Sequence, residues 1–237
     1  MSKAISETWV CDSCGKEQVC KVWASINTQL DPELKLKLID GTLNFFNCQN
    51  QNCWDTKRFV DILYHDMDKG LMIWLMQNYS SQNSINELAN SLVNFCDLNQ
   101  KRILRIVKTR TELIEKIMIT DDGLDDRVIE VLKSVFVQQN KIDSGLECNL
   151  LYTGKSDHPQ EGIVLTFNGS LPVMFNRPNP ITVAPIRISI YNKINEILTQ
   201  VAGPSDKGSW LEINSNYARP VANILVKNDW VFGEACG

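Results

Sequence analysis

The stretch WVCDSCGKEQVCKVW, residues 9–23, decides how the N-terminal part of this chain folds. Cys11 and Cys14 are separated by two residues, a spacing that lets both thiols point at one metal ion. Gly15 follows directly and can adopt the positive φ that turns backbone N–H groups toward the sulfurs. The next residues alternate between polar and apolar, which is typical of a strand. The stretch therefore predicts a metal-binding loop that leads into a β-strand.

A second pair of cysteines, Cys48 and Cys53, offers the other half of a four-cysteine site. A structural zinc site takes four ligands in a tetrahedron, and two short cysteine loops are a common way to supply them. This pair is spaced more widely than the first, so Asn50 or Asn52 would have to supply any left-handed conformation that the loop needs. The sequence predicts a structural Zn²⁺ site with the ligands Cys11, Cys14, Cys48 and Cys53.

Two other roles for the first pair are open. A redox dithiol of the thioredoxin type places Cys-x-x-Cys at a helix N-terminus, whereas a strand is predicted after Gly15. The thiols could also be small buried side chains without a metal, as free cysteines often are. We expect Cys20, Cys96 and Cys148 to be structural, and Cys236 lies in the C-terminal tail.

Composition limits the class of protein. The chain has 237 residues, a formal net charge of −4 and eight cysteines, five of them within the first 53 residues. The first residues show no apolar segment typical of a signal peptide, and the most apolar window, residues 71–76, is too short to cross a bilayer, which needs roughly 20 apolar residues. We expect a cytoplasmic protein with reduced thiols and no membrane contact, in which clustered cysteines favour a metal site.

One basic segment, KRILRIVKTR at residues 101–110, stands out in this acidic chain. An acidic run follows it, so we interpret the segment as a solvated face that is balanced internally. A groove for nucleic acid or another anionic partner is the alternative, and the net negative charge makes nucleic-acid binding less favourable. We therefore expect no nucleic-acid partner.

The first 79 residues are expected to form a zinc-ribbon-like unit. A short helix is predicted over residues 31–40, with Asp31 as N-cap, Pro32 in the first turn and Gly41 at its end. Two β-rich runs follow, joined by MDKG at 67–70, which predicts a hairpin with a positive φ at Gly70. The polar residues 78–84 are expected to be a linker.

Residues 84–237 are expected to form a mixed second domain. Apolar spacing and capping signals predict helices near 84–98, 110–119 and 123–138, with a short strand run at 102–108. From about residue 147 the chain becomes β-rich, with one helix near 187–201, and the segments SWLEINS and ANILVKNDWVF are counted among the later β-rich pieces. The predicted fold class is α+β: a zinc ribbon with hairpins and a short helix, followed by a mixed α/β domain.

Longer segments carry a family resemblance. The first cysteine loop, then VWASINTQLDPELKLKLIDGTLNFFNC, LYHDMDKGLMIW and LRIVKTRTELIEKIMITDDGLDDRVIEVLK, are similar to the bacterial CpXC-domain family over residues 9 to about 135. That family is named for two Cys-Pro-x-Cys loops and has no established biochemical function. The resemblance implies a zinc-ribbon-like fold. Asp12 replaces the usual proline, and the second pair departs from the family spacing.

No catalytic residue is predicted. His65 is interpreted as a turn histidine bonded to its neighbours, with a fifth metal ligand as the alternative, and His158 as a surface residue. The acids Asp121, Asp122, Asp125 and Asp126 fit the electrostatics of a helix start better than a calcium loop.

We expect a structural zinc site in a protein that binds an unknown protein partner or itself. The alternatives are an enzyme with an active site in the C-terminal half, near Tyr152, Asn176 to Arg177, Tyr191 or Trp210, and a nucleic-acid-binding protein that uses residues 101–110. Binding that weakens with salt and with changes at Arg102 and Arg105 would favour the nucleic-acid role.

Overall fold

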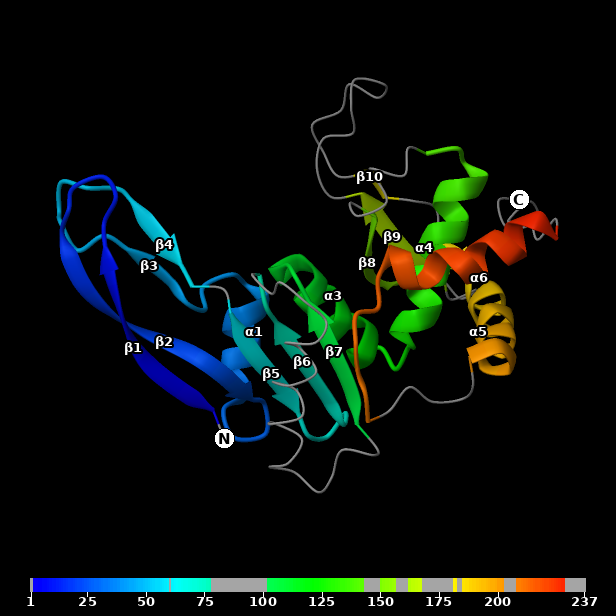
Figure 1. Cartoon of the computed structure of the whole chain (residues 1–237), viewed down its shortest axis with the longest axis horizontal. Coiled ribbons are helices and arrows are strands. Elements are labelled where there is room, and N and C mark those ends of the chain that lie inside the picture. Colours follow the sequence, from blue (N-terminus) through cyan, green and yellow to red (C-terminus); the bar gives the residue numbers. More distant parts are fainter. Residues whose placement is uncertain are drawn as a thin grey trace. The chain divides into compact units, whose positions relative to one another are not determined.

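The computed structural model divides the chain into two compact units (Figure 1). It describes residues 2–59, 61–77, 102–142, 150–156, 162–167, 181–182, 185–202 and 208–228. The first unit comprises residues 1–114 and 207–211, and the second comprises 115–206 and 212–237. Helices and sheets occur together, and four cysteines cluster near the N-terminus, so the predicted α+β class is confirmed.

A six-stranded sheet in the order β1-β2-β5-β6-β7-β12 forms the body of the first unit. Its strands are β1 (Lys3–Val10), β2 (Glu17–Asn27), β5 (Ile62–Asp66), β6 (Leu71–Leu75), β7 (Ile103–Val107) and β12 (Trp210–Leu211). The pairs β1/β2 and β5/β6 are antiparallel, whereas β2/β5, β6/β7 and β7/β12 are parallel. A separate antiparallel ribbon consists of β3 (Phe45–Asn47) and β4 (Thr56–Arg58).

The predicted helix and hairpin of this unit are both present. Helix α1 (Pro32–Ile39) buries Leu34 and Leu38, and Gly41 follows it with a φ of 91°. Asp31 is the N-cap residue, but its side chain makes no capping hydrogen bond. The hairpin between β5 and β6 turns at Gly70, whose φ of 60° explains why glycine occupies that position.

The second unit combines a small antiparallel sheet with helices. Strand β9 (Gly162–Phe167) pairs with β8 (Leu150–Lys155), β10 (Ile181–Thr182) and β11 (Ile186–Arg187). Helix α4 (Asp126–Gln139) contacts β8, α5 (Ile188–Ala202) and α6 (Ser215–Lys227). Apolar side chains from β8, β9, β11 and the three helices form one core, which includes Val131, Leu165 and Leu198.

The predicted helices agree with the structure where it describes them. The segment 110–119 is α3 (Arg110–Asp121), and 187–201 is α5. Helix α4 begins three residues later than predicted, because Asp125 is its N-cap and accepts a hydrogen bond from the backbone N–H of Arg127. The helix predicted near 84–98 lies outside the described residues.

The prediction of a late β-rich piece at ANILVKNDWVF is wrong for its first part. Residues 222–227 of this segment belong to α6, in which Ala218, Ala222 and Leu225 are buried with helical spacing. Pro220 lies inside this helix and removes one backbone hydrogen bond, so packing against α4 must outweigh the local preference. The β-branched residues Ile224 and Val226 favour a strand locally, which explains why the prediction is wrong.

The predicted domain boundary at 79–84 falls within residues 78–101, which the structure does not describe, and it stays a prediction. The first compact unit continues to Ile114, because β7 pairs with β6 in the same sheet. Strand β1 was not anticipated, although it is the longest partner of β2. None of the helices in the described ranges is long and apolar enough to cross a membrane.

Candidate metal centre

The first cysteine loop joins β1 to β2 and is closed by backbone hydrogen bonds. Cys11 directly follows β1, its N–H donates to the carbonyl of Lys16 at 3.0 Å, and the N–H of Gly15 donates to the carbonyl of Cys11 at 2.9 Å. Gly15 has a φ of 70°, so glycine serves the backbone conformation here, since a Cβ at this position would meet no atom within 4 Å. The loop thus has the shape that the sequence predicts.

The second loop joins β3 to β4. Cys48 donates its N–H to the carbonyl of Asp55 at 2.8 Å, and Cys53 donates to the carbonyl of Asn50 at 2.9 Å. The Asn50 side chain accepts a hydrogen bond from the N–H of Asn52 at 3.1 Å. Neither asparagine has a positive φ, so the loop requires no left-handed conformation at these positions: the longer spacing leaves room for a turn of ordinary backbone conformation.

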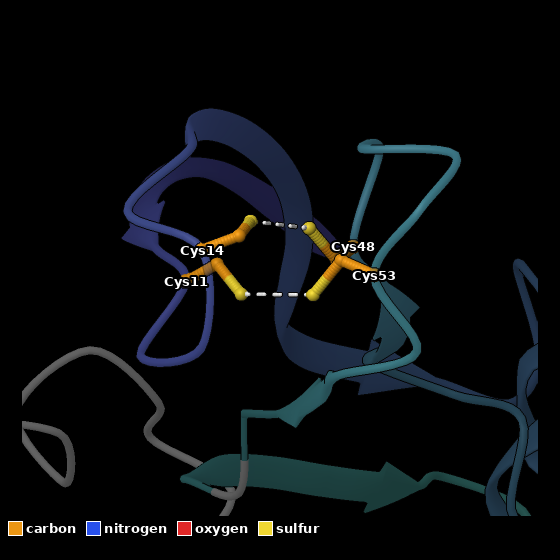
Figure 2. A group of neighbouring side chains, drawn as sticks. All are labelled: Cys11, Cys14, Cys48 and Cys53. Carbon is orange, nitrogen blue, oxygen red and sulfur yellow. Dashed lines mark hydrogen bonds between the residues drawn. The ribbon is translucent and has the colours of Figure 1, made fainter.

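The two loops bring four sulfur atoms together (Figure 2). The Sγ atoms of Cys11 and Cys53 are 3.6 Å apart, as are those of Cys14 and Cys48, and all four lie within 4.8 Å of one another. A disulfide would require about 2.05 Å, so these are free thiols. Four sulfurs around a zinc ion, each at about 2.3 Å, would be separated by about 3.8 Å in a tetrahedron. The observed cluster therefore has the size of a metal site.

Polar contacts tie the two loops to each other beside the sulfurs. Lys16 Nζ donates to the carbonyl of Gln49 at 2.9 Å, and the N–H of Gln49 donates to Gln18 Oε1 at 2.8 Å. The Asp55 carboxylate accepts from Ser13 Oγ at 3.1 Å and from the Cys11 thiol at 3.3 Å. These contacts position the cysteines, and the sequence does not reveal them because they join residues more than 30 positions apart.

The thiols have unequal acidities. Burial raises the pKa of Cys11 to about 12. The pKa of Cys14 is lowered to about 6, first by the backbone N–H of Lys16 and then by the side chain of Asn50. Cys14 is also exposed, whereas Cys11 and Cys48 are buried. Because metal ligands bind as thiolates, Cys14 is the thiol most ready to accept an ion.

A small apolar cluster supports the centre from within the first unit. Trp9, Cys20 and Val22 are buried beside Cys11 and Cys48. Phe46 and Phe59 pack against this cluster and meet edge to face, with ring centroids 5.9 Å apart. Cys20 is a buried strand residue outside the sulfur group, as predicted. Cys96, Cys148 and Cys236 lie outside the described residues.

His65 does not join the sulfur group that the described residues form. It lies on β5, not in the turn, and its Nε2 is 3.1 Å from Nη1 of Arg102. Burial, followed by the positive charge of Arg102, lowers its pKa to about 4. Nothing here favours a fifth metal ligand, and His158 lies outside the described residues.

The basic segment is not a solvated face, and that interpretation is wrong. Arg102 and Arg105 are 8% and 2% exposed, because they lie in or next to the inner strand β7. The side chain of Arg110 donates to the carbonyl of Leu38 at the end of α1. The side chains of Arg102, Arg105 and Arg110 therefore contact other groups of the protein and serve the packing of the fold.

Three of the four acidic residues singled out in the sequence make structural contacts. Asp125 caps α4, as helix-start electrostatics predicts, and pairs with Arg127 at 2.6 Å. Asp126 is buried and forms an ion pair with Lys116 at 3.3 Å. Asp122 accepts a short hydrogen bond from the hydroxyl of Tyr152. The cluster gathers around helix ends and leaves no carboxylate group arranged for a cation among the described residues.

The residues named for a C-terminal active site are mostly core residues. Tyr152 and Tyr191 are 1% and 7% exposed, and the Tyr191 hydroxyl accepts a hydrogen bond from the N–H of Asp125 at 2.7 Å. Trp210 is buried against Leu104 in the first unit. Asn176 and Arg177 lie outside the described residues. The described part of the chain does not assemble these residues into a reactive group.

A buried ionic network in the second unit was not anticipated. Lys133 Nζ lies 3.0 Å from both Glu115 and Glu130, and Lys116 pairs with Glu130 at 3.0 Å. Glu115 also accepts the N–H of Tyr152 at 2.6 Å. In the sequence, the one sign of this network is that charged residues lie among apolar residues on two consecutive helices. Charged residues at surface positions give the same pattern, so the network could not be predicted.

The fold and this site define a class of α+β proteins with two short loops that present four cysteines to one point. Comparison with known families narrows the class: the family model described as CpXC protein matches residues 10–133. The chain therefore belongs to the CpXC family. No curated protein and no solved structure matches it.

Proposed function

We propose that the four cysteines bind one structural Zn²⁺ ion, and that the protein is an interaction module or scaffold for another protein. The observation that carries this proposal is the set of four Sγ atoms within 4.8 Å, contributed in pairs by two loops. Four thiolates fill the coordination sphere of zinc and leave no open position for a substrate. The metal would therefore hold the loops together without taking part in a reaction.

The arrangement of the sulfurs supports a metal over a redox dithiol. The nearest sulfur pairs join different loops, Cys11 to Cys53 and Cys14 to Cys48, whereas a redox Cys-x-x-Cys motif pairs within one loop. Strand β2 follows the first loop, so the activating helix N-terminus of thioredoxin-like sites is missing there. Cys14 is exposed, which argues against thiols that only fill the core.

The interaction role is supported by the surface next to the sulfurs. Trp54 follows Cys53 directly and is 93% exposed, although a large aromatic side chain usually gains from burial. Exposed tryptophans are enriched among the residues that dominate binding to partner proteins. A cytoplasmic location belongs to the proposal, because four free thiols require a reducing compartment.

Metal analysis of the purified native chain tests the zinc site. We expect about one zinc ion per chain and its loss in Cys14→Ser, a change at an exposed position that leaves the core intact. Cys20→Ala is a stringent control, because Cys20 packs beside Cys11 and Cys48 without belonging to the sulfur group, and it should keep its zinc. Native protein with far less than one metal ion per chain would contradict the proposal.

A further inference from the structure

The six-stranded sheet of the first unit has two very different edges. One edge is β12, with two residues, and the other is β1, with eight. Figure 1 shows β1 running along β2, its partner in the sheet. An antiparallel strand with one neighbour directs the N–H and C=O groups of every second residue outward. No described residue bonds to these outward groups of β1.

Strand β1 lacks the usual protection of an exposed edge. Proteins block such edges with proline, bulges, many charges or very short strands. The register shift in this ribbon places the extra residue, Ala24, on β2, so β1 itself stays regular. The eight residues contain no proline and two charges, Lys3 and Glu7. An edge of this kind can accept another strand.

The positions of the two charges select a partner and a register. Two copies of a strand can pair antiparallel about a twofold axis perpendicular to the sheet. Residues directly opposite each other then lie on the same face, and the residue numbers of each opposite pair have the same sum. If Ile5 meets Ile5, then Lys3 of each copy lies opposite Glu7 of the other. Lys3 is exposed and Glu7 half-buried, so both charges are accessible. Two opposite-charge pairs would stabilise this register.

Neighbouring registers are less favourable. A shift that centres the pair on Glu7 would oppose two glutamates, and a shift that centres it on Ser6 would place Glu7 against Ile5 and Lys3 against Trp9. Like charges directly opposite each other destabilise a strand pair, and a charge against an apolar side chain gains nothing. The charge pattern of β1 is therefore complementary to itself in one arrangement.

We propose that the protein forms a homodimer in which β1 pairs antiparallel with β1 of a second copy, centred on Ile5. The six-stranded sheet of each chain then continues into that of its partner. This inference gives the proposed interaction module one defined partner and rests on that proposed function, but it needs no metal chemistry.

Charge reversal tests the register directly. Sedimentation velocity of the full chain over a wide concentration range should show a monomer–dimer equilibrium. Lys3→Glu and Glu7→Lys each turn two attractive pairs into two repulsive ones and should raise the dimer dissociation constant about tenfold or more. The double variant Lys3→Glu/Glu7→Lys restores both pairs with opposite polarity and should return the constant close to its native value. Only a partner with the same strand can produce this rescue.

The control is Lys57→Glu, an exposed lysine on β4 with the same change of charge, which should leave the dimer unchanged. Circular dichroism shows that each variant is folded. A chain that stays monomeric, single variants with the native dissociation constant, or a double variant that fails to recover would each overturn the dimer. Zinc content is measured on the same samples. A monomer that contains zinc would contradict the dimer but not the metal site, and a dimer without zinc would contradict the metal site but not the dimer.

Discussion

The carboxylate of Asp55 lies 3.3 Å from the thiol of Cys11 and accepts its hydrogen bond, although the two residues belong to different loops. The same carboxylate accepts from Ser13 at 3.1 Å. Without metal, these hydrogen bonds lower the pKa of Asp55 and hold the loops together. When a metal ion binds, the thiol of Cys11 releases its proton to the solvent. The Asp55 carboxylate then lies beside a negatively charged thiolate. Asp55 thus favours the closed loops but opposes a fully ionised cluster.

We therefore predict that Asp55→Asn binds zinc more tightly than the native chain. Asparagine keeps an oxygen for Ser13, removes one negative charge and can donate an N–H to the thiolate. Changes next to metal ligands typically alter affinity by about 10- to 100-fold, and we expect the low end of that range. Competition with a chromophoric chelator measures the effect, with Asp12→Asn on the opposite loop as the control. Weaker binding in Asp55→Asn would show that the carboxylate supports the metal instead.

The contact between His65 and Arg102 predicts a pH dependence of stability. The folded state lowers the pKa of His65 from 6.5 to about 4, so the unfolded chain binds the proton more tightly. The free energy of unfolding therefore does not depend on His65 protonation above pH 6.5. It decreases as the pH falls from 6.5 toward 4, because the unfolded chain takes up the proton first. Allowing for partial exposure of the ring, we expect a loss of about 2 kcal/mol from this residue over that window.

Urea unfolding at several pH values measures this effect. The variant His65→Gln keeps an oxygen that can accept from Arg102 but cannot titrate, so its stability should fall less than that of the native chain between pH 6.5 and 4. Acidic residues titrate in both proteins. The difference between the two plots of unfolding free energy against pH therefore gives the effect of His65 alone. Parallel curves would show that the histidine does not carry the proposed pKa shift.

The sequence predicted those parts of the site that depend on local spacing. Cys11, Cys14 and Gly15 form a tight loop because backbone geometry over five residues leaves few alternatives. The pairing of this loop with Cys48 and Cys53 followed from the chemistry of a tetrahedral ion. The contacts of Asp55, Lys16 and Gln18 were missed, because hydrogen bonds between distant segments leave no periodic signal.

The errors in the fold have a common cause. The charge of Arg105 predicts a surface position, yet the residue lies on an inner strand of a sheet. Residues 222–227 include the β-branched Ile224 and Val226, which favour a β-rich piece, yet burial of Ala222 and Leu225 and the contacts of α6 with α4 favour a helix. Local propensity is a weak term, and tertiary packing outweighed it in both places.

The N-cap of α6 should contribute measurably to the stability of the second unit. Asn214 Oδ1 accepts hydrogen bonds from the N–H groups of Asn216 and Tyr217, at 3.0 and 3.3 Å. Asn214→Ala leaves both donors without this acceptor, and we expect a loss of about 1 kcal/mol in the free energy of unfolding. Asn214→Ser loses the hydrogen bond that Asn214 Nδ2 donates to Glu212, as Asn214→Ala does, but it keeps an oxygen that can cap the helix, so it should lose less stability than Asn214→Ala. Equal losses in both variants would show that the cap bonds are not the cause.

The buried ionic network should be the most sensitive feature of the second unit. Lys133 compensates Glu115 and Glu130 at 3.0 Å each, and all three side chains are at most 7% exposed. Lys133→Met leaves two carboxylates with less compensation in a site that excludes water, so we expect a loss of about 3–5 kcal/mol in the free energy of unfolding. Lys227→Met, at an exposed position of α6, should change stability by less than about 0.5 kcal/mol.

A further substitution separates charge from packing in this network. Because burial raises the pKa of Glu115, its neutral form is the easier one to accommodate once Lys133 is gone. Lys133→Met combined with Glu115→Gln should therefore recover part of the lost stability, since the amide still accepts the N–H of Tyr152. Chemical denaturation of the single and double variants gives the coupling energy. Strictly additive losses would mean that Lys133 acts through its packing and not through its charge.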